Sequence, residues 1–182
     1  MQIHHSTYES TVVGRGYEKA LKKFKSSLSF DLRSANIYPF DFLVPPYYFF
    51  SLMPRDMYDA NALSYVLHID KGLVDTKELD NLAEILHFID TGVNTSVPAS
   101  DIALVVQCFL PGAAQVFRSD TDPVLLRPAI AAPALSHDEN GAKLVFTYAK
   151  DGRGMNIAQC SLLINTEGKI ELQCKDIPLR KN

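Results

Sequence analysis

The chain contains no tryptophan and only three cysteines in 182 residues. No apolar run approaches the ~20 residues that a membrane-spanning helix needs. The first residues lack the basic and apolar regions of a secretory signal peptide, so none is expected. An odd number of cysteines without metal-ligand spacing favours reduced thiols in a cytosol-like compartment. We therefore expect a cytoplasmic protein with no membrane segment, although Cys160 and Cys174 fall on neighbouring expected strands and one disulfide between them is the alternative.

Sequence signatures of catalysis and cofactor binding are also absent. The chain has no Gly-x-Ser-x-Gly elbow, no phosphate-binding loop and no dinucleotide-binding fingerprint. No cofactor and no metal ion are therefore expected. Residues 41–101 carry ten acidic side chains against three basic ones. Binding to the phosphates of a nucleic acid needs clustered Lys and Arg, so no nucleic-acid partner is expected either.

What the chain does contain is the composition of an ordinary globular protein. Hydrophobic residues make up 47% of it and charged residues 21%. A chain of this length most simply forms one core, which predicts a single domain spanning residues 1–182.

Two segments have the period of an amphipathic helix. Apolar residues recur at three- and four-residue steps over residues 17–28, with lysines mostly on the other side. The same spacing runs over residues 76–90, where Asp75 and Glu78 match a variant of the capping box that begins helices. Helices are therefore predicted near 17–28 and 76–90.

Between these helices, residues 37–54 are rich in proline and aromatic residues. The segment contains four prolines, and each proline biases the residue before it away from the helical region. Extended chain or turns that lie over the core are therefore predicted. Residues 62–69 then alternate between apolar and polar, which favours a strand, although Pro54 is suited to begin a helix instead.

The segment after the second helix is interpreted as strands. Residues 102–110 form an apolar run that ends at Pro111-Gly112, and a buried strand is predicted there. Three further prolines divide the following stretch into short extended pieces suited to a sheet edge, at positions 123, 128 and 133.

The C-terminal segment has the clearest pattern. Large apolar residues alternate with smaller residues over 144–149, apolar residues alternate with polar ones over 170–175, and an apolar stretch lies between them at 155–164. Glycine-containing turns separate the three stretches, at residues 151–154 and 165–168. A three-stranded antiparallel meander is predicted, in which the last strand has one apolar and one charged face.

Two pairs of a histidine and a carboxylate are the candidates for catalysis. His68 and Asp70 share one face of the expected strand, and His87 and Asp90 are three apart on the expected helix. Either geometry suits a general base oriented by a carboxylate, or two ligands of a metal ion. The sequence favours the alternative, a local hydrogen bond at the end of each element, because spacing specifies no third partner.

Three other features are interpreted first as structure. The aromatic run that begins in a Pro-Pro-x-Tyr pattern, of the kind that WW domains read, is the candidate binding segment, yet its apolar neighbours predict burial. Its residues are Tyr47, Tyr48, Phe49 and Phe50. Cys108 lies in an apolar run and is predicted to be a small core residue. Residues 137–139 are predicted to form a solvated turn.

Together these patterns predict an α+β fold, with a mainly antiparallel sheet, a C-terminal three-stranded meander and two packed helices. Two functions are compatible with that fold. The first is a non-catalytic binding or regulatory protein that engages a protein partner. The alternative is a small enzyme or small-molecule-binding domain, with an aromatic-lined pocket and one of the histidine–carboxylate pairs.

Overall fold

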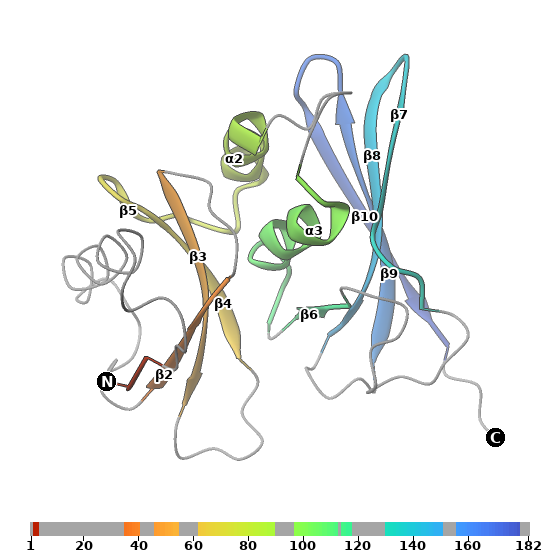
Figure 1. The fold of residues 1–182 in the computed structure, drawn as a ribbon. Coiled ribbons are helices and arrows are strands. Elements are labelled where there is room, and N and C mark those ends of the chain that lie inside the picture. Colours follow the sequence, from red (N-terminus) through yellow and green to blue (C-terminus); the bar gives the residue numbers. More distant parts are fainter. Residues whose placement is uncertain are drawn as a thin grey trace. The chain divides into compact units, whose positions relative to one another are not determined.

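A computed structural model of the chain describes residues 2–3, 35–40, 46–54, 62–89, 97–112, 114–117, 130–150 and 156–178. Contacts divide the chain into two compact units, residues 1–75 and 76–182 (Figure 1). Each unit contains a mainly antiparallel sheet, and the described helices lie in the second unit. The predicted α+β class is confirmed, whereas the single domain stays a prediction and the helix over 17–28 lies outside the described residues.

The first unit is built on one sheet whose strands follow one another in chain order. The strands are β1 (Gln2–Ile3), β2 (Ala35–Pro39), β3 (Tyr47–Pro54), β4 (Leu63–His68) and β5 (Gly72–Leu73). β1 runs parallel to β2, and the other neighbours are antiparallel. The extended chain predicted over residues 37–54 is confirmed where the structure describes it, in β2 and β3, and residues 41–45 lie outside the described residues. The strand predicted over 62–69 is confirmed, so the alternative helix from Pro54 is wrong, because β4 occupies the segment that it would have included.

β3 is apolar on both of its faces, and both are buried. Tyr47 and Phe49 point to one side, Phe50 and Leu52 to the other, and each is at most 3% exposed. Phe50 stacks on Tyr65 of the neighbouring strand, with ring centroids 5.6 Å apart. The aromatic segment therefore does not lie over the core of the first unit, because it forms that core.

The second unit contains the predicted meander. Strands β8 (Gly141–Ala149), β9 (Ile157–Asn165) and β10 (Ile170–Ile177) pair antiparallel in that order, which confirms it. Two shorter strands, β6 (Gln115–Val116) and β7 (Ala134–Asp138), pair with the edge of β8 that β9 leaves free. β7 is a correction to the sequence analysis, since His137 and Asp138 end this strand and only Glu139 of the expected turn lies in the turn.

The helices of the second unit are α2 (Leu79–Ile89) and α3 (Ala99–Gln107), and both lie on one side of its sheet (Figure 1). α2 confirms the predicted second helix, but it begins at Leu79, so Asp75 is too far from its start to be its cap. Neither described helix is long and apolar enough to cross a membrane.

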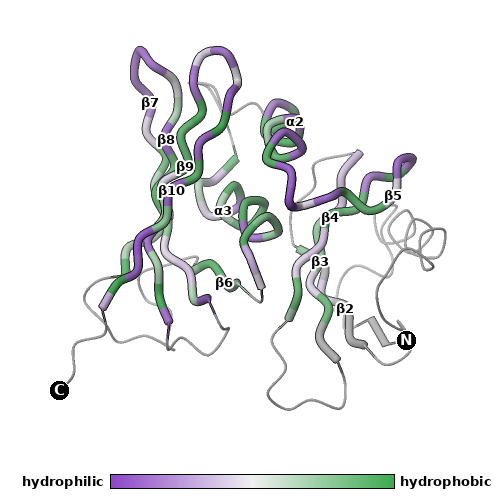
Figure 2. The backbone as a smooth tube through the Cα atoms, turned by 180° about the vertical axis from the view of Figure 1, so that it is seen from behind, coloured by the Kyte–Doolittle hydropathy of each residue, from purple (hydrophilic) through white to green (hydrophobic). Residues whose placement is uncertain are grey.

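α3 contradicts the strand predicted over residues 102–110. Each of those residues is buried, and the helix is hydrophobic along most of its length (Figure 2). A helix covered on all sides has no polar face, so its sequence lacks the three-to-four-residue period that identifies helices at a surface. The apolar run had the length of a strand but belonged to a buried helix.

The core of the second unit lies between these helices and the facing side of the meander, which we call the inner face. It is formed by alternate residues of each strand, so that Phe146 of β8, Cys160 of β9 and Cys174 of β10 stand in one row. Phe146 and Cys160 are each 1% exposed, and the next row on the same face contains the fully buried Leu144 and Leu162. Alternation of side chains along paired strands gives the meander one apolar face.

Gly141 provides a test of this register. Its φ is +136°, and a Cβ on this residue would collide with the backbone carbonyl of Ile164 on the adjacent strand. Gly168 also has positive φ, +77°, but a Cβ there would meet nothing. Gly168→Ala should lower the free energy of unfolding by about 1–2 kcal/mol, the cost of left-handed backbone. Gly141→Ala should cost about 1–3 kcal/mol more, because it adds overpacking.

Urea denaturation of the two variants and the wild type measures both costs. Equal losses of stability in the two variants would contradict the close approach of β8 and β9 at Gly141.

Candidate functional site

His68, from the first catalytic candidate pair, holds a turn. Its side chain is 8% exposed, and its ring lies edge-on to that of Tyr47, with centroids 5.1 Å apart. Its Nδ1 atom accepts hydrogen bonds from the backbone N–H groups of Asp70 and Lys71, both at 3.1 Å. An Nδ1 that accepts carries no proton. His68 therefore makes the local hydrogen bond that the sequence favoured, and a catalytic role for His68 with Asp70 stays a prediction.

The second pair is only partly described. His87 is exposed in the last turn of α2, with its ring 6.4 Å from that of Phe88, whereas Asp90 lies outside the described residues. The proposed adjacency of His87 and Asp90 therefore stays a prediction.

The candidate binding segment is mostly inaccessible. Tyr47, Phe49 and Phe50 are buried, and Tyr48 is partly buried. A recognition motif has to be exposed to be read, so a partner would have to displace these side chains from the core of the first unit. Their role in binding stays a prediction.

Cys108 is the core residue that the sequence predicts. It is 3% exposed directly after α3, and its thiol lies 3.8 Å from the carbonyl oxygen of Leu104. Burial raises the pKa of the Cys108 thiol well above its usual range, which keeps it protonated. A protonated, buried thiol is a poor nucleophile.

A buried polar residue that the sequence analysis passed over lies next to it. Gln107 is 7% exposed, and its Oε1 accepts a hydrogen bond from the backbone N–H of Val116 at 2.7 Å. This bond ties the end of α3 to β6 and satisfies a backbone donor that would otherwise be buried without a partner. The signal in the sequence was one amide within an apolar run.

No group of three or more His, Cys, Asp or Glu side chains suited to a metal ion occurs in the described parts of the chain. Two hollows of about 300 Å³ and 320 Å³ lie on the sheet of the second unit. Neither is lined by a histidine. In the first, at the hairpin ends, the side chains of Asp138 and Asn165 already accept backbone N–H groups of their own turns.

Among the described residues, β10 is an edge strand of the second sheet. Within the described chain it pairs with β9 over its whole length and with no other strand. Opposite Cα atoms of Cys160 and Cys174 are 4.1 Å apart, the spacing of antiparallel pairs that exchange no backbone hydrogen bonds. The N–H of Asn165 donates a hydrogen bond to the carbonyl of Lys169, in the pair next to Ile164–Ile170. Pairs that exchange hydrogen bonds alternate with pairs that do not, so this bond also places Cys160 and Cys174 in a pair without them.

The alternation of hydrogen-bonded and non-hydrogen-bonded pairs determines which backbone groups of β10 point away from β9. Residues of pairs that exchange no hydrogen bonds point their N–H and C=O groups away from the partner strand. In β10 these residues are Leu172, Cys174 and Asp176, together with Ile170 at the start of the strand. The edge therefore presents a row of backbone donors and acceptors that pair with no strand in the described part of the chain.

The side chains of β10 agree with the predicted apolar and charged faces. On the inner face Ile170 and Leu172 are partly buried, whereas Cys174 is exposed; on the other face Glu171 and Lys175 are exposed. The apolar face is therefore only partly covered along this strand.

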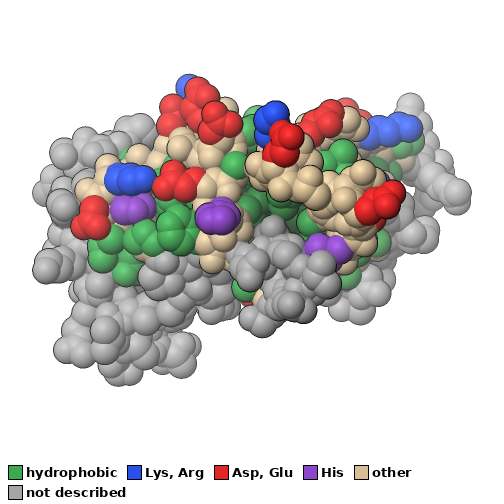
Figure 3. Space-filling view, turned by 90° about the horizontal axis from the view of Figure 1, so that it is seen from above, with side chains coloured by type: hydrophobic (Ala, Val, Ile, Leu, Met, Phe, Trp, Pro, Cys, Tyr) green, Lys and Arg blue, Asp and Glu red, His purple; other side chains and the backbone are tan. Residues whose placement is uncertain are grey.

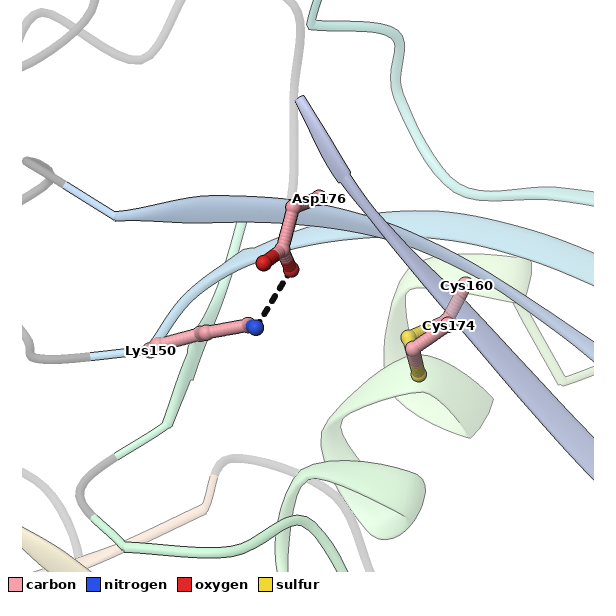
Figure 4. The surroundings of a disulfide bond; sticks show 4 residues. All are labelled: Lys150, Cys160, Cys174 and Asp176. Atoms are coloured by element: carbon pink, nitrogen blue, oxygen red, sulfur yellow. Dashed lines mark ion pairs between the residues drawn. A yellow bond between two sulfur atoms is a disulfide. The ribbon is translucent and has the colours of Figure 1, made fainter. Parts of the chain in front are cut away.

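Cys160 and Cys174 form a disulfide across β9 and β10 (Figure 4). The expectation of three reduced thiols is therefore wrong for this pair. Hydrophobic alternation predicts which face a residue occupies, but it does not fix which residue stands opposite on the next strand, and the register decides the pairing.

The same face becomes polar beyond the disulfide, where Lys150 pairs with Asp176 (Figure 4). Tyr148 lies two residues before Lys150 and is 3% exposed. Burial raises the pKa of the Tyr148 phenol, Lys150 opposes that rise, and the charge of Asp176 adds to it.

A pair of substitutions tests the role of His68. His68→Ala removes the acceptor for two backbone N–H groups and should lower the free energy of unfolding by about 1–3 kcal/mol. His68→Asn places an amide oxygen where Nδ1 lies and should restore much of that loss, because Asn closes such turns with its side chain. Chemical denaturation measures both. If His68→Asn is as unstable as His68→Ala, the two bonds to the turn do not explain the role of this residue.

The raised pKa of Tyr148 predicts a pH dependence. The unfolded phenol loses its proton near its ordinary pKa of 10.0, whereas the folded one keeps it to higher pH. This contribution to stability is complete below pH 10 and is lost as the pH rises through the folded pKa. Between about pH 9 and 11 the free energy of unfolding should fall more steeply for the wild type than for Tyr148→Phe. The free energy of unfolding is measured by urea denaturation at each pH. If it falls equally steeply with pH in the wild type and in Tyr148→Phe, the prediction is wrong.

Comparison with known proteins adds no relative: no family model, no curated protein and no solved structure matches the chain. What the chain does has to be inferred from its own residues.

Proposed function

We propose that the chain is a non-catalytic binding protein that engages a protein partner by taking an extended segment of that partner onto the edge of β10. The observation that carries the proposal is the outward row of backbone groups at Leu172, Cys174 and Asp176. Strand addition of this kind obtains affinity from main-chain hydrogen bonds and specificity from alternate side chains.

The side chains of β10 suggest which segments would fit. On the inner face, the partly buried Ile170 and Leu172 suit apolar residues at alternate positions of the partner. On the other face, Glu171 and Lys175 are exposed and four residues apart, so they suit a basic and an acidic residue at the matching spacing.

Charged residues on an edge strand also discourage unselective pairing. The mixed signs on β10 matter here, because a row of one sign would attract any segment of the opposite sign. Glu171 and Lys175 instead favour segments with one particular order of charges, which is what a selective binding edge requires.

Two further observations support a protein partner over the alternatives. Lys and Arg side chains are scattered among acidic ones on the face seen in Figure 3, and phosphate binding needs them clustered. Neither hollow on the sheet has a histidine in its lining, and the Nδ1 atom of His68 is occupied by a turn. Both weaken the small-enzyme alternative.

A cytoplasmic location is part of the proposal. The odd cysteine count supports it, and the Cys160–Cys174 disulfide weighs against it, since disulfides persist mainly in oxidising compartments.

Peptides selected for binding from a displayed random library provide the test. Leu172→Pro removes an outward N–H while leaving the β9 ladder its donors, so it should weaken the selected peptides at least about tenfold. Leu172→Ala, the matched control, keeps that N–H and should retain more of the affinity. Titration calorimetry measures both.

Hydrogen exchange supplies an independent measurement on the wild type. Bound peptide should newly protect the amides of Leu172, Cys174 and Asp176, whereas Gln173 is already protected by β9. The proposal is wrong if the selected peptides leave those outward amides exchanging as before, or if Leu172→Pro binds them as tightly as the wild type.

A further inference from the structure

We propose that the Cys160–Cys174 disulfide is a thiol-exchange site, which takes a small thiol or a dithiol at the sulfur of Cys174. The inference rests on other observations than the binding function proposed above, namely the access to two sulfur atoms and the stability of one hairpin.

The two halves of the disulfide differ sharply in access. Cys160 is 1% exposed on the central part of the inner face, whereas Cys174 is exposed on the edge strand. Exchange begins when a thiolate reaches a disulfide sulfur, so access decides which of the two sulfurs is attacked. The structure favours attack on Cys174.

The first step is a substitution at sulfur. The attacking thiolate forms a bond to the sulfur of Cys174, the bond between the two cysteines breaks, and its electron pair leaves on the sulfur of Cys160. That sulfur is buried, so it takes up a proton from water and becomes a thiol. The product is a mixed disulfide on Cys174 beside a buried Cys160 thiol.

The attacking molecule decides what happens next. After attack by a monothiol such as glutathione, Cys160 remains opposite Cys174 and can close the disulfide again, which expels the glutathione. After attack by a dithiol, the second thiol of that molecule attacks the reagent's sulfur in the mixed disulfide. Cys174 leaves as a thiolate and takes up a proton from water. The dithiol is then oxidised to its disulfide, and the protein has gained two electrons and two protons.

The hairpin has other bonds that hold it while the disulfide is open. β9 and β10 are paired from Ile157–Ile177 to Ile164–Ile170. The connecting turn is closed by a hydrogen bond from the N–H of Gly168 to the carbonyl of Asn165 at 2.9 Å. The side chain of Asn165 accepts two further backbone N–H groups, at 3.0 and 2.8 Å. Opening the disulfide should therefore change the chemistry of the edge without unfolding it.

Cys108 is an internal control for the reactivity of these sulfurs. It is buried after α3, and burial raises its pKa, so a reagent that enters only at the exposed edge should leave it unmodified. A reagent that modifies Cys108 has entered by unfolding.

Matched variants of the full chain, treated with oxidised glutathione, test the site. In Cys160→Ser the free Cys174 should gain one glutathione, by attacking its disulfide and releasing one reduced glutathione. In Cys174→Ser the buried Cys160 should stay unmodified until urea unfolds the protein. Intact mass and peptide mapping locate the adduct, and amide spectra check that each variant is folded.

The wild type gives a measurement that needs no substitution. Dithiothreitol in native buffer should reduce the disulfide within about tenfold of the rate for the urea-unfolded chain, and the amide spectrum of the hairpin should persist. The inference is overturned if the disulfide survives until the protein unfolds, if the hairpin spectrum is lost on reduction, or if the native adduct maps to Cys160 or Cys108. Leu172→Pro leaves both sulfurs in place, so failure of peptide binding and failure of exchange are separate results.

Discussion

The antiparallel register that joins β8, β9 and β10 is the constraint on which the second unit depends. It sets Phe146 opposite Cys160, and Cys160 opposite Cys174, so that one face of three strands carries a continuous apolar row. A shift by one residue would turn that row to the opposite face and expose the core. Two local features hold the register: the close approach of Gly141 to the β9 backbone, and the turn that Asn165 closes with its side chain.

Where one face of an element meets polar surroundings, the sequence predicted the structure well. The meander, β4 and α2 each have a period in their apolar residues because one side packs and the other does not. The aromatic segment around β3 was predicted as extended chain from its prolines alone, since its two buried faces give no alternation. Proline restricts the conformation of the local backbone, so the sequence predicts extended chain there whether or not the side chains are buried.

The sequence-based predictions failed where packing, and not local pattern, decides. α3 is buried on every side, so its period was invisible and Ile102 to Leu110 were taken for a strand. β7 exists because it pairs with β8, and its own residues alternate in burial without a strong apolar signal. For the candidate site, the sequence correctly favoured a local bond for His68. It gave the Cys160–Cys174 disulfide only as the alternative and missed the open edge, because both depend on which residues the register places opposite one another.

β10 combines the properties of a core strand and of a surface strand, and both proposals follow from that combination. Its inner face continues the apolar row of β8 and β9, but Ile170 and Leu172 are only partly buried and Cys174 is exposed. The register that points the Cys174 side chain at Cys160 also points its backbone N–H and C=O outward. Cys174 thus forms a disulfide to the neighbouring strand, and its backbone groups face away from the sheet, where no described strand pairs with them. A strand added at this edge would cover the sulfur of Cys174, so an occupied edge would slow exchange, and an adduct on Cys174 would in turn hinder the added strand.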